Sequence, residues 1–593
     1  MGLLQNAVDT YDAMAHRAGA VYGEEKEPLA PVSHIIVRAE IKITLDQDGN
    51  FVSAQALDKT DPKIIIPVTE ASAGRTSAPC AHPLCDQLGY VAPYDEKKHG
   101  LYLAALTDWE QSPYTHPVLR PVLEYVRSGT ILADLSRVGM IQLLPDGGPA
   151  NEKLMICWVV NGLGEGLNGP CWESQSLMRA FVGYSAAKRS GASSALCMVT
   201  GEMESPAGQH PKGIVPLNGN AKLISANDSS GFTYRGRFDR DDQAATVGYT
   251  ASQKAHCALR WLVANQGVPF GGRTFLCWNP QGKKLPSVHG PMARKSGQKA
   301  ADPTQYRQLL LESLSGWKRE LPERAGVVIA AFDAATTGRL SVTYYNELLA
   351  SDFLDRLCDW EKSCCWENGA FGIQSPSLFQ IVNLAFGTLR GGKVETDKRI
   401  LAQQMQRLIA CRIDRAAFPV DIERSLVERA SNIQIYAGQK PEETRELRED
   451  LLFTTCAVIR KYHIDHFKEE WDMALDKDCT DRSYLFGRLL AIAEMVERST
   501  YSGENVRETN ALRMQKAFAL RPMASWRMLE ERLEPYYKQL SPGLRQHYRG
   551  MAQEIADKLS PASPELNQKL EDIYLLGYYH QRAYRKEKPE TEE

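Results

Sequence analysis

Apolar residues are spaced differently in the two halves of the chain. Up to about residue 350, short apolar runs typical of β-strands lie at residues 34–39, 154–160 and 326–332. Between these runs, residues 174–188 and 250–265 repeat apolar positions at helical spacing, and Gly, Asn, Pro and Ser fill the loops. This half is therefore predicted to be α+β, with one or two domains.

The second half follows a helical pattern. From about residue 375, apolar positions recur every three or four residues, β-branched runs are rare, and Leu, Ala, Glu and Arg dominate. The polar stretch at residues 434–448, around Pro441, is typical of a loop between helices. The last amphipathic runs predict a small helical bundle with short connections, because turn residues break them near 502–503, 522, 542–543 and 561–564.

The fold class expected for the whole chain is therefore α+β, with a mixed N-terminal half and an all-helical C-terminal half. The 593 residues are too many for one hydrophobic core. We divide the chain into an α+β region at residues 1–350, a helical region at 351–472 and a C-terminal helical bundle at 473–593.

Composition limits the class of protein. Apolar residues make up 43% of the chain and charged residues 24%, which is ordinary for globular proteins and argues against general disorder. The N-terminus lacks the features of a secretory signal, and no apolar run approaches the roughly 20 residues of a membrane span. The 13 cysteines lack the spacing of a zinc site or a disulfide framework. We expect a cytoplasmic protein with reduced thiols and no membrane partner.

Positive charge gathers in one segment, although the net charge of the chain is −3. Residues 191–300 carry 13 Lys and Arg against 6 Asp and Glu. A local cationic excess of this kind is typical of a surface that contacts phosphates. Any nucleic-acid site is therefore expected to be local and to lie in this segment.

The loop at residues 210–238 has the residue types that such a site needs. Glycine turns let backbone N–H groups and cations approach phosphates, Asn side chains both donate to and accept from base edges, and Tyr234 is able to stack on an unpaired base. We list as nucleic-acid-binding candidates Lys212, Asn218, Asn220, Lys222, Asn227, Ser229, Ser230, Tyr234, Arg235, Arg237, Arg75, Lys283 and Lys284.

Each of these candidates also has a structural interpretation. The loop at 210–238 could be a solvated hairpin whose Asn and Gly residues only make turns. Arg75 could belong to a structural turn, and Lys283 and Lys284 could belong to a solvated charge run.

Motifs of enzymes are missing from the sequence. We find no P-loop, HExxH, GxSxG, HD dyad or paired acidic residues in a convincing context. His463 and His466 lie one helical turn apart, but no third metal ligand accompanies them, which favours an ordinary helical face. We therefore expect no catalytic residues, no metal and no cofactor. The alternative is a metal-dependent nuclease that uses scattered His and Asp residues of the first half.

Several blocks of the sequence, in order, resemble those of one known family. They lie at residues 197–202 with 210–211, at 218–238, at 335–348, at 484–491 and at 575–582. With these blocks the chain resembles, over nearly its whole length, the large subunit of the type I-C CRISPR Cascade complex, which is the Cas-eight-c family.

The resemblance implies a non-catalytic role in a crRNA-guided complex that serves antiviral defence. The expected partners are backbone subunits that hold the guide, a smaller subunit that caps its 5′ end, target double-stranded DNA, the displaced strand and a helicase-nuclease. Base pairing with the guide would read the target, so the large subunit would recognise only the short PAM motif and help to open the duplex.

The family also encodes a small subunit from an internal start, and the resemblance makes Met473 the candidate start here. A structural scaffold without direct DNA contact is a further alternative.

Overall fold

The computed structural model describes residues 2–58, 60, 63–75, 78–191, 193–216, 219–225, 246–292, 299–334, 338–436, 441–502, 507–559 and 564–584. The chain forms two compact units: Met1–Lys284 with Gly326–Leu348, and Leu285–Ala325 with Leu349–Glu593. The division into three regions that we expect from the sequence stays a prediction.

The first unit mixes strands and helices. In chain order its elements are α1 (Leu3–Met14), β1 (His34–Val37), β2 (Ile41–Leu45), β3 (Phe51–Ala56), β4 (Ile64–Pro67), α2 (Glu70–Gly74), α3 (Leu88–Val91), α4 (Glu96–Glu110), α5 (Leu119–Ser128), α6 (Ile131–Arg137), β5 (Ile156–Val160), β6 (Gly169–Pro170), α7 (Gln175–Arg189), β7 (Ala195–Leu196), β8 (Met203–Glu204), α9 (Tyr249–Gln266), β9 (Val268–Phe270), β10 (Arg273–Trp278), β11 (Gly326–Asp333) and β12 (Ser341–Leu349).

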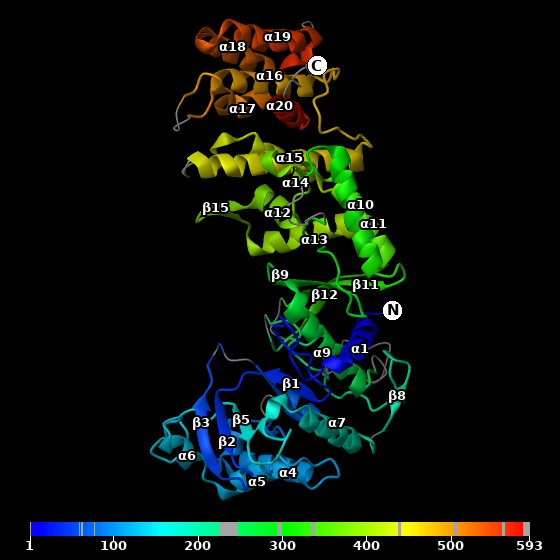
Figure 1. Cartoon of the computed structure of the whole chain (residues 1–593), viewed down its shortest axis with the longest axis vertical. Coiled ribbons are helices and arrows are strands. Elements are labelled where there is room, and N and C mark those ends of the chain that lie inside the picture. The colour runs from blue at the N-terminus through cyan, green and yellow to red at the C-terminus, as the bar shows by residue number, and fades with distance from the viewer. Residues whose placement is uncertain are drawn as a thin grey trace, which may run out of the picture. The chain divides into compact units, whose positions relative to one another are not determined.

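One sheet of this unit has the strand order β3–β2–β5–β6. Strand β2 alternates buried and half-buried residues, whereas every residue of β5 is buried, as expected for a strand covered on both faces. The two strands run parallel, with Ile43 opposite Trp158. Helices α4 and α5 lie beside this sheet (Figure 1). They contribute Trp109 and Tyr125 to its core.

A second sheet of the first unit has the order β12–β11–β10–β9, and helices α1 and α9 share its core. Three residues of the loop at residues 210–238, which we call the cationic loop, are buried in the same core: Ile214, Val215 and Ala221. The described part of the loop is therefore anchored by apolar contacts on both sides of residues 217–218.

The second unit is mostly helical. Its elements are α10 (Pro303–Glu320), α11 (Ala350–Ser363), β13 (Trp366–Glu367), β14 (Ile373–Gln374), α12 (Leu378–Phe386), β15 (Thr388–Arg390), β16 (Lys393–Glu395), α13 (Lys398–Asp414), α14 (Val420–Ala430), α15 (Pro441–His466), α16 (Arg482–Arg498), α17 (Asn510–Leu520), α18 (Pro522–Gln539), α19 (Pro542–Lys558) and α20 (Tyr574–Ala583). The antiparallel pairs β13–β14 and β15–β16 are short exceptions to the helical pattern. The α+β class and the helical C-terminal half are confirmed.

A buried ion pair organises the start of this unit. The Arg412 guanidinium donates to Glu361 at 2.7 Å and to the carbonyls of Val288 and Gly290 at 2.8 and 2.9 Å. The Glu361 carboxylate also accepts from the backbone N–H of Met292 at 3.2 Å. These bonds attach residues 288–292 to α11, which carries Glu361, and to α13, which carries Arg412.

The loop that the sequence predicts at residues 434–448 is only partly correct. Helix α15 begins at Pro441 and runs to His466, so the second part of that stretch is helical. Proline is favoured in the first helical turn, where its missing N–H would have no partner, and Glu442 and Glu443 interact favourably with the positive end of the helix dipole. From Pro441 onward, the polar composition therefore marks the start of a helix.

The expected C-terminal bundle is present. Helix α16, at the centre of the bundle, packs against α17, α18, α19 and α20 (Figure 1). Most residues of α16 are buried, which explains why its sequence shows apolar residues on all sides.

Candidate nucleic-acid interface

The cationic loop borders a cavity within the first unit. The cavity has a volume of about 190 Å³ and is formed by β1, α2, α9 and the segment at residues 209–222. Its lining residues extend along the chain from Ala30 to Arg260, so only the tertiary structure assembles it.

Lys212 and Lys222 lie side by side at this cavity. Their backbones form an antiparallel bridge, and the carbonyl of Lys222 accepts from the N–H of Leu340 at 2.9 Å. Burial lowers the pKa of Lys212 below its usual value, and the nearby charges of Lys222 and Arg75 lower it further. Two like charges are thus held together at a partly desolvated position.

Neither ammonium has a carboxylate partner within the part of the chain that the structure describes. The other charged residues that line the cavity are Arg260 and Glu70. Arg260 donates to Glu27 at 3.2 Å, and the carboxylate of Glu70 accepts from the backbone N–H of Gln209. Among the described residues that line the cavity, the positive charges of Lys212 and Lys222 therefore exceed the single negative charge of Glu70, and an anion would neutralise the excess.

Arg75 lies close to the lysines but is held by the protein. Its guanidinium makes a two-pronged ion pair with Asp86, at 2.5 and 2.8 Å, and donates to the carbonyl of Cys80 at 2.8 Å. It also lies over the ring of Tyr90, 4.5 Å from the ring centre. Asp86 is fully buried, so these contacts give Arg75 a structural role; its contact with phosphate stays a prediction.

The interior of the cavity carries polar groups from α9. Gln253 is 5% exposed and His256 is 2% exposed, and both line the cavity. The rings of His210 and His256 stack with centres 6.0 Å apart, and each ring contacts Ser252. Burial lowers the pKa of both histidines to about 4, so both are neutral near pH 7.

The other predicted residues are placed as follows. Asn220 is exposed and lies between Gly219 and Ala221 in the loop. Lys283 and Lys284 are exposed after β10 and do not line the cavity. The remaining candidates, which lie outside the described residues, are Asn218, Asn227, Ser229, Ser230, Tyr234, Arg235 and Arg237.

A comparison with protein-family models gives a match to the CRISPR-associated protein (Cas_Csd1) over residues 8–585, which is nearly the whole chain. The chain belongs to the Cas_Csd1 family of CRISPR-associated proteins. This match confirms the family resemblance expected from the sequence, and it is consistent with a type I-C Cascade large subunit. A search of curated proteins finds no match to the chain.

Sequence reasoning missed the α9 residues of this CRISPR-associated protein. Gln253 and His256 lie within a segment whose periodicity correctly predicts a helix, and nothing in their local sequence separates them from ordinary helical residues. The residue types of the loop at 210–238 and the local charge count drew attention to Lys212 and Lys222.

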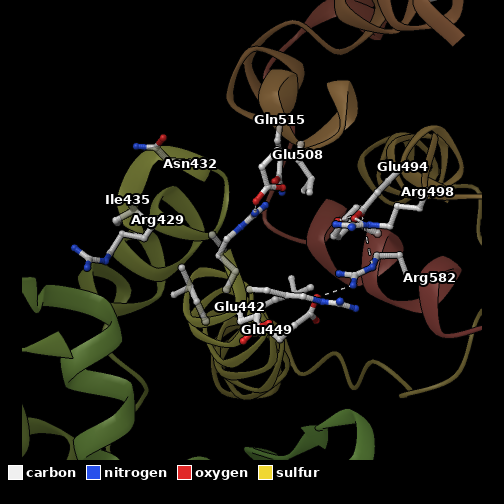
Figure 2. A pocket seen from close by; sticks show the side chains of 17 residues that line it. Arg429, Asn432, Ile435, Glu442, Glu449, Glu494, Arg498, Glu508, Gln515 and Arg582 are labelled. Carbon is white, nitrogen blue, oxygen red and sulfur yellow. Dashed lines mark hydrogen bonds and ion pairs between the residues drawn. The ribbon is translucent and has the colours of Figure 1, made fainter. Parts of the chain in front are cut away.

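A second cavity, of about 140 Å³, lies in the second unit between α15 and the bundle. Figure 2 shows Glu494, Arg498 and Arg582 gathered on one side of it. Arg498 donates to Glu494 at 2.6 Å, and Arg582 donates to Glu449 at 2.7 Å. These two guanidinium groups are therefore paired within the protein.

No group of three or more His, Cys, Asp or Glu residues suited to a metal ion occurs among the described residues. His463 and His466 instead contact the protein, His463 through Asp572 at 3.0 Å and His466 through the carbonyl of Phe418 at 2.8 Å. No helix in the described ranges is both long and apolar enough to cross a membrane.

Proposed function

We propose that this CRISPR-associated chain is the non-catalytic large subunit of a type I-C Cascade complex, and that its cationic loop contacts the duplex carrying the PAM. The observation that carries the proposal is the pair Lys212 and Lys222, which lack a carboxylate partner in the described chain. Double-stranded DNA presents a negative charge about every 1.7 Å along its axis, which would neutralise such a pair.

The proposed division of labour explains why the net charge stays near zero. Guide RNA pairs with the target and reads most of its sequence, so the protein needs only a local site for the short PAM and the first opened base pairs. The proposed partners are guide-holding and guide-capping subunits, a small subunit that starts at Met473, the displaced strand and the helicase-nuclease.

The first test is the affinity of the whole complex, co-expressed with the neighbouring genes and a guide RNA, for target DNA. Randomised PAM positions are expected to abolish binding. Changing Lys212 and Lys222 to Gln is expected to weaken binding, because phosphate contacts are lost. Each lost contact is also expected to lower the slope of log affinity against log salt by about one. Mobility-shift titrations over a salt series measure both effects.

Lys153→Gln is the matched control, since Lys153 is exposed in the same unit and does not line the cavity. Binding that ignores both the PAM and the two lysines would contradict the proposal and favour a scaffold without DNA contact. DNA cleavage by the isolated chain with a divalent metal would instead favour the metal-dependent nuclease.

A further inference from the structure

The cavity beside Lys212 contains hydrogen-bonding groups that the described protein does not use. The side-chain amide of Gln253 has no hydrogen bond to any described residue, although the side chain is 5% exposed. The Nε2 atom of His256 is buried and also lacks a partner. A buried polar atom without a partner is costly, so the unpartnered Nε2 of His256, with the unused amide of Gln253 at the same cavity, points to a polar ligand.

The tautomer of His256 defines what this ligand must supply. Nδ1 lies 2.7 Å from the carbonyl oxygen of Ser252, which only accepts, so Nδ1 carries the proton. Because burial keeps the ring neutral, Nε2 is then an acceptor. The ligand therefore needs a donor for His256, and Gln253 offers both a donor and an acceptor.

The remaining walls favour a flat apolar body. Ala30, Ile35, Val37 and Ala73 line the cavity, together with the stacked imidazole of His210. An engineered cavity of about 150 Å³ is able to hold benzene, and this cavity has about 190 Å³. The space therefore admits one aromatic heterocycle.

We propose that the cavity binds one nucleotide, with its base against Gln253 and His256 and its phosphate on Lys212 and Lys222. This inference rests on the proposed function, because a base reaches the cavity from a duplex only when it leaves the stack. A base with an exocyclic amino group supplies the donor that His256 lacks, and glutamine is the side chain that pairs with adenine in two hydrogen bonds. Because of this two-bond pairing with Gln253, adenine is expected to bind best.

The same chemistry could come from a strand or from a free nucleotide, and two measurements separate these sources. In the first, 2-aminopurine replaces single bases near the PAM, and its fluorescence is recorded when the whole guide complex binds the DNA. In the second, free deoxynucleoside monophosphates are titrated into the purified full chain by calorimetry. A rise in fluorescence at one strand position is expected, with weaker binding of the free nucleotides.

Gln253→Met keeps the size of the side chain and removes its hydrogen bonds. It is expected to reduce nucleotide capture by roughly fivefold, the effect of losing about 1 kcal/mol, while affinity for the PAM duplex changes less. Gln266→Met is the matched control, because Gln266 is exposed on the same helix and outside the cavity. Ala73→Leu, which fills the cavity from α2, is a second variant in case Gln253→Met fails to fold, as a thermal melt would show.

Four outcomes of these measurements distinguish the sources of the nucleotide and test the site itself. Fluorescence that rises in the unchanged complex and falls in both variants supports a nucleotide of the strand. Free nucleotides that bind the unchanged chain and not the variants, without any fluorescence change, support a free nucleotide. Tight duplex binding with neither signal overturns the inference and leaves the proposed function standing. If the complex does not bind the duplex, the proposed function is overturned. The calorimetric titration is then the only test of the nucleotide site, and a chain that binds no free nucleotide overturns this inference as well.

Discussion

The cations of the first unit differ in what surrounds them. Arg75 and Arg260 are each bonded to a carboxylate, Asp86 and Glu27 respectively, and so hold parts of the unit together. The lysines at the cavity have no such partner in the described chain. Residues of equal charge therefore differ in their surroundings: the two arginines are paired within the protein, whereas the two lysines are the groups that we propose bind phosphate.

A second cluster of ionisable groups lies where α14 and α15 meet the segment before α20. Nε2 of His463 bonds Asp572 at 3.0 Å, and Glu423 is 5% exposed beside them. Burial raises the pKa of Glu423 to about 8, and the negative charge of Asp572 contributes to the rise. The carboxyl group is therefore largely protonated at neutral pH.

This raised pKa predicts a pH-dependent loss of stability in the second unit. Glu423 ionises near 4.5 when the chain is unfolded, so the folded state loses stability as the pH rises from 4.5 toward about 8. Glu423→Gln removes that cost. The variant is expected to melt at a higher temperature than the unchanged protein at about pH 8, with a smaller gain at about pH 5.

Thermal melts at both pH values measure this effect. Glu428→Gln, an exposed substitution on the same helix, is the control and should give no pH-dependent gain. An equal shift of Glu423→Gln at both pH values would show that the carboxyl group does not titrate abnormally.

Among the elements, α16 and α20 make the closest helix contact of the bundle. Gly487 of α16 faces the backbone of Tyr574, and Gly577 of α20 faces the backbone of Tyr484. A Cβ atom at either glycine would collide with a carbonyl oxygen of the other helix. The glycines cost helix propensity, but they allow the two backbones to approach.

Gly577→Ala is therefore expected to destabilise the bundle. The added methyl group must push the two backbones apart, and overpacking of this kind costs about 1–3 kcal/mol. Amide hydrogen exchange in α16 and α20 measures the change locally, which suits a chain with two units.

Gly550→Ala in α19 is the matched control, because a Cβ atom there meets no atom within 4 Å. It is expected to stabilise its helix by about 0.5–1 kcal/mol. Protection that is unchanged in Gly577→Ala would mean that the two helices are not in close contact.

For the molecule as a whole, the stretch between α15 and α16 links the bundle to the rest of the second unit. Met473 lies in this stretch and packs against a small core that includes Tyr306, Leu310 and Cys358. In the full chain this methionine is thus a packing residue.

The proposed internal start predicts a second protein product from the same gene. Met473→Leu, written with a codon that does not initiate, is expected to remove a product of about one fifth of the 66.2 kDa mass of the full chain. Leucine fills a similar volume, so the full chain is expected to stay folded. Gel electrophoresis of the expressed gene with a C-terminal tag detects both products.

Met495→Leu, at a half-buried position in α16, is the control and should leave the short product unchanged. A short product that persists in Met473→Leu would show that translation starts elsewhere or that proteolysis makes the fragment.

Periodicity and charge counts were enough to predict much of this protein. They gave the α+β first half, the helical second half, the final bundle and the cationic segment that contains Lys212 and Lys222. These features depend on residues that are close in the chain, because helix and strand patterns repeat within a few positions. The helix start at Pro441 was missed because polar residues serve both loops and first helical turns.

The cavity with Gln253 and the unpartnered Nε2 of His256, and the neutralisation of Arg75 by Asp86, were decided only by the tertiary structure. Each of these features joins segments that are distant in sequence, and packing of the shared apolar core brings those segments together. Burial and partners, which set the pKa and the hydrogen-bonding needs of a side chain, follow from that packing. They are properties of the folded chain and have no counterpart in the order of its residues.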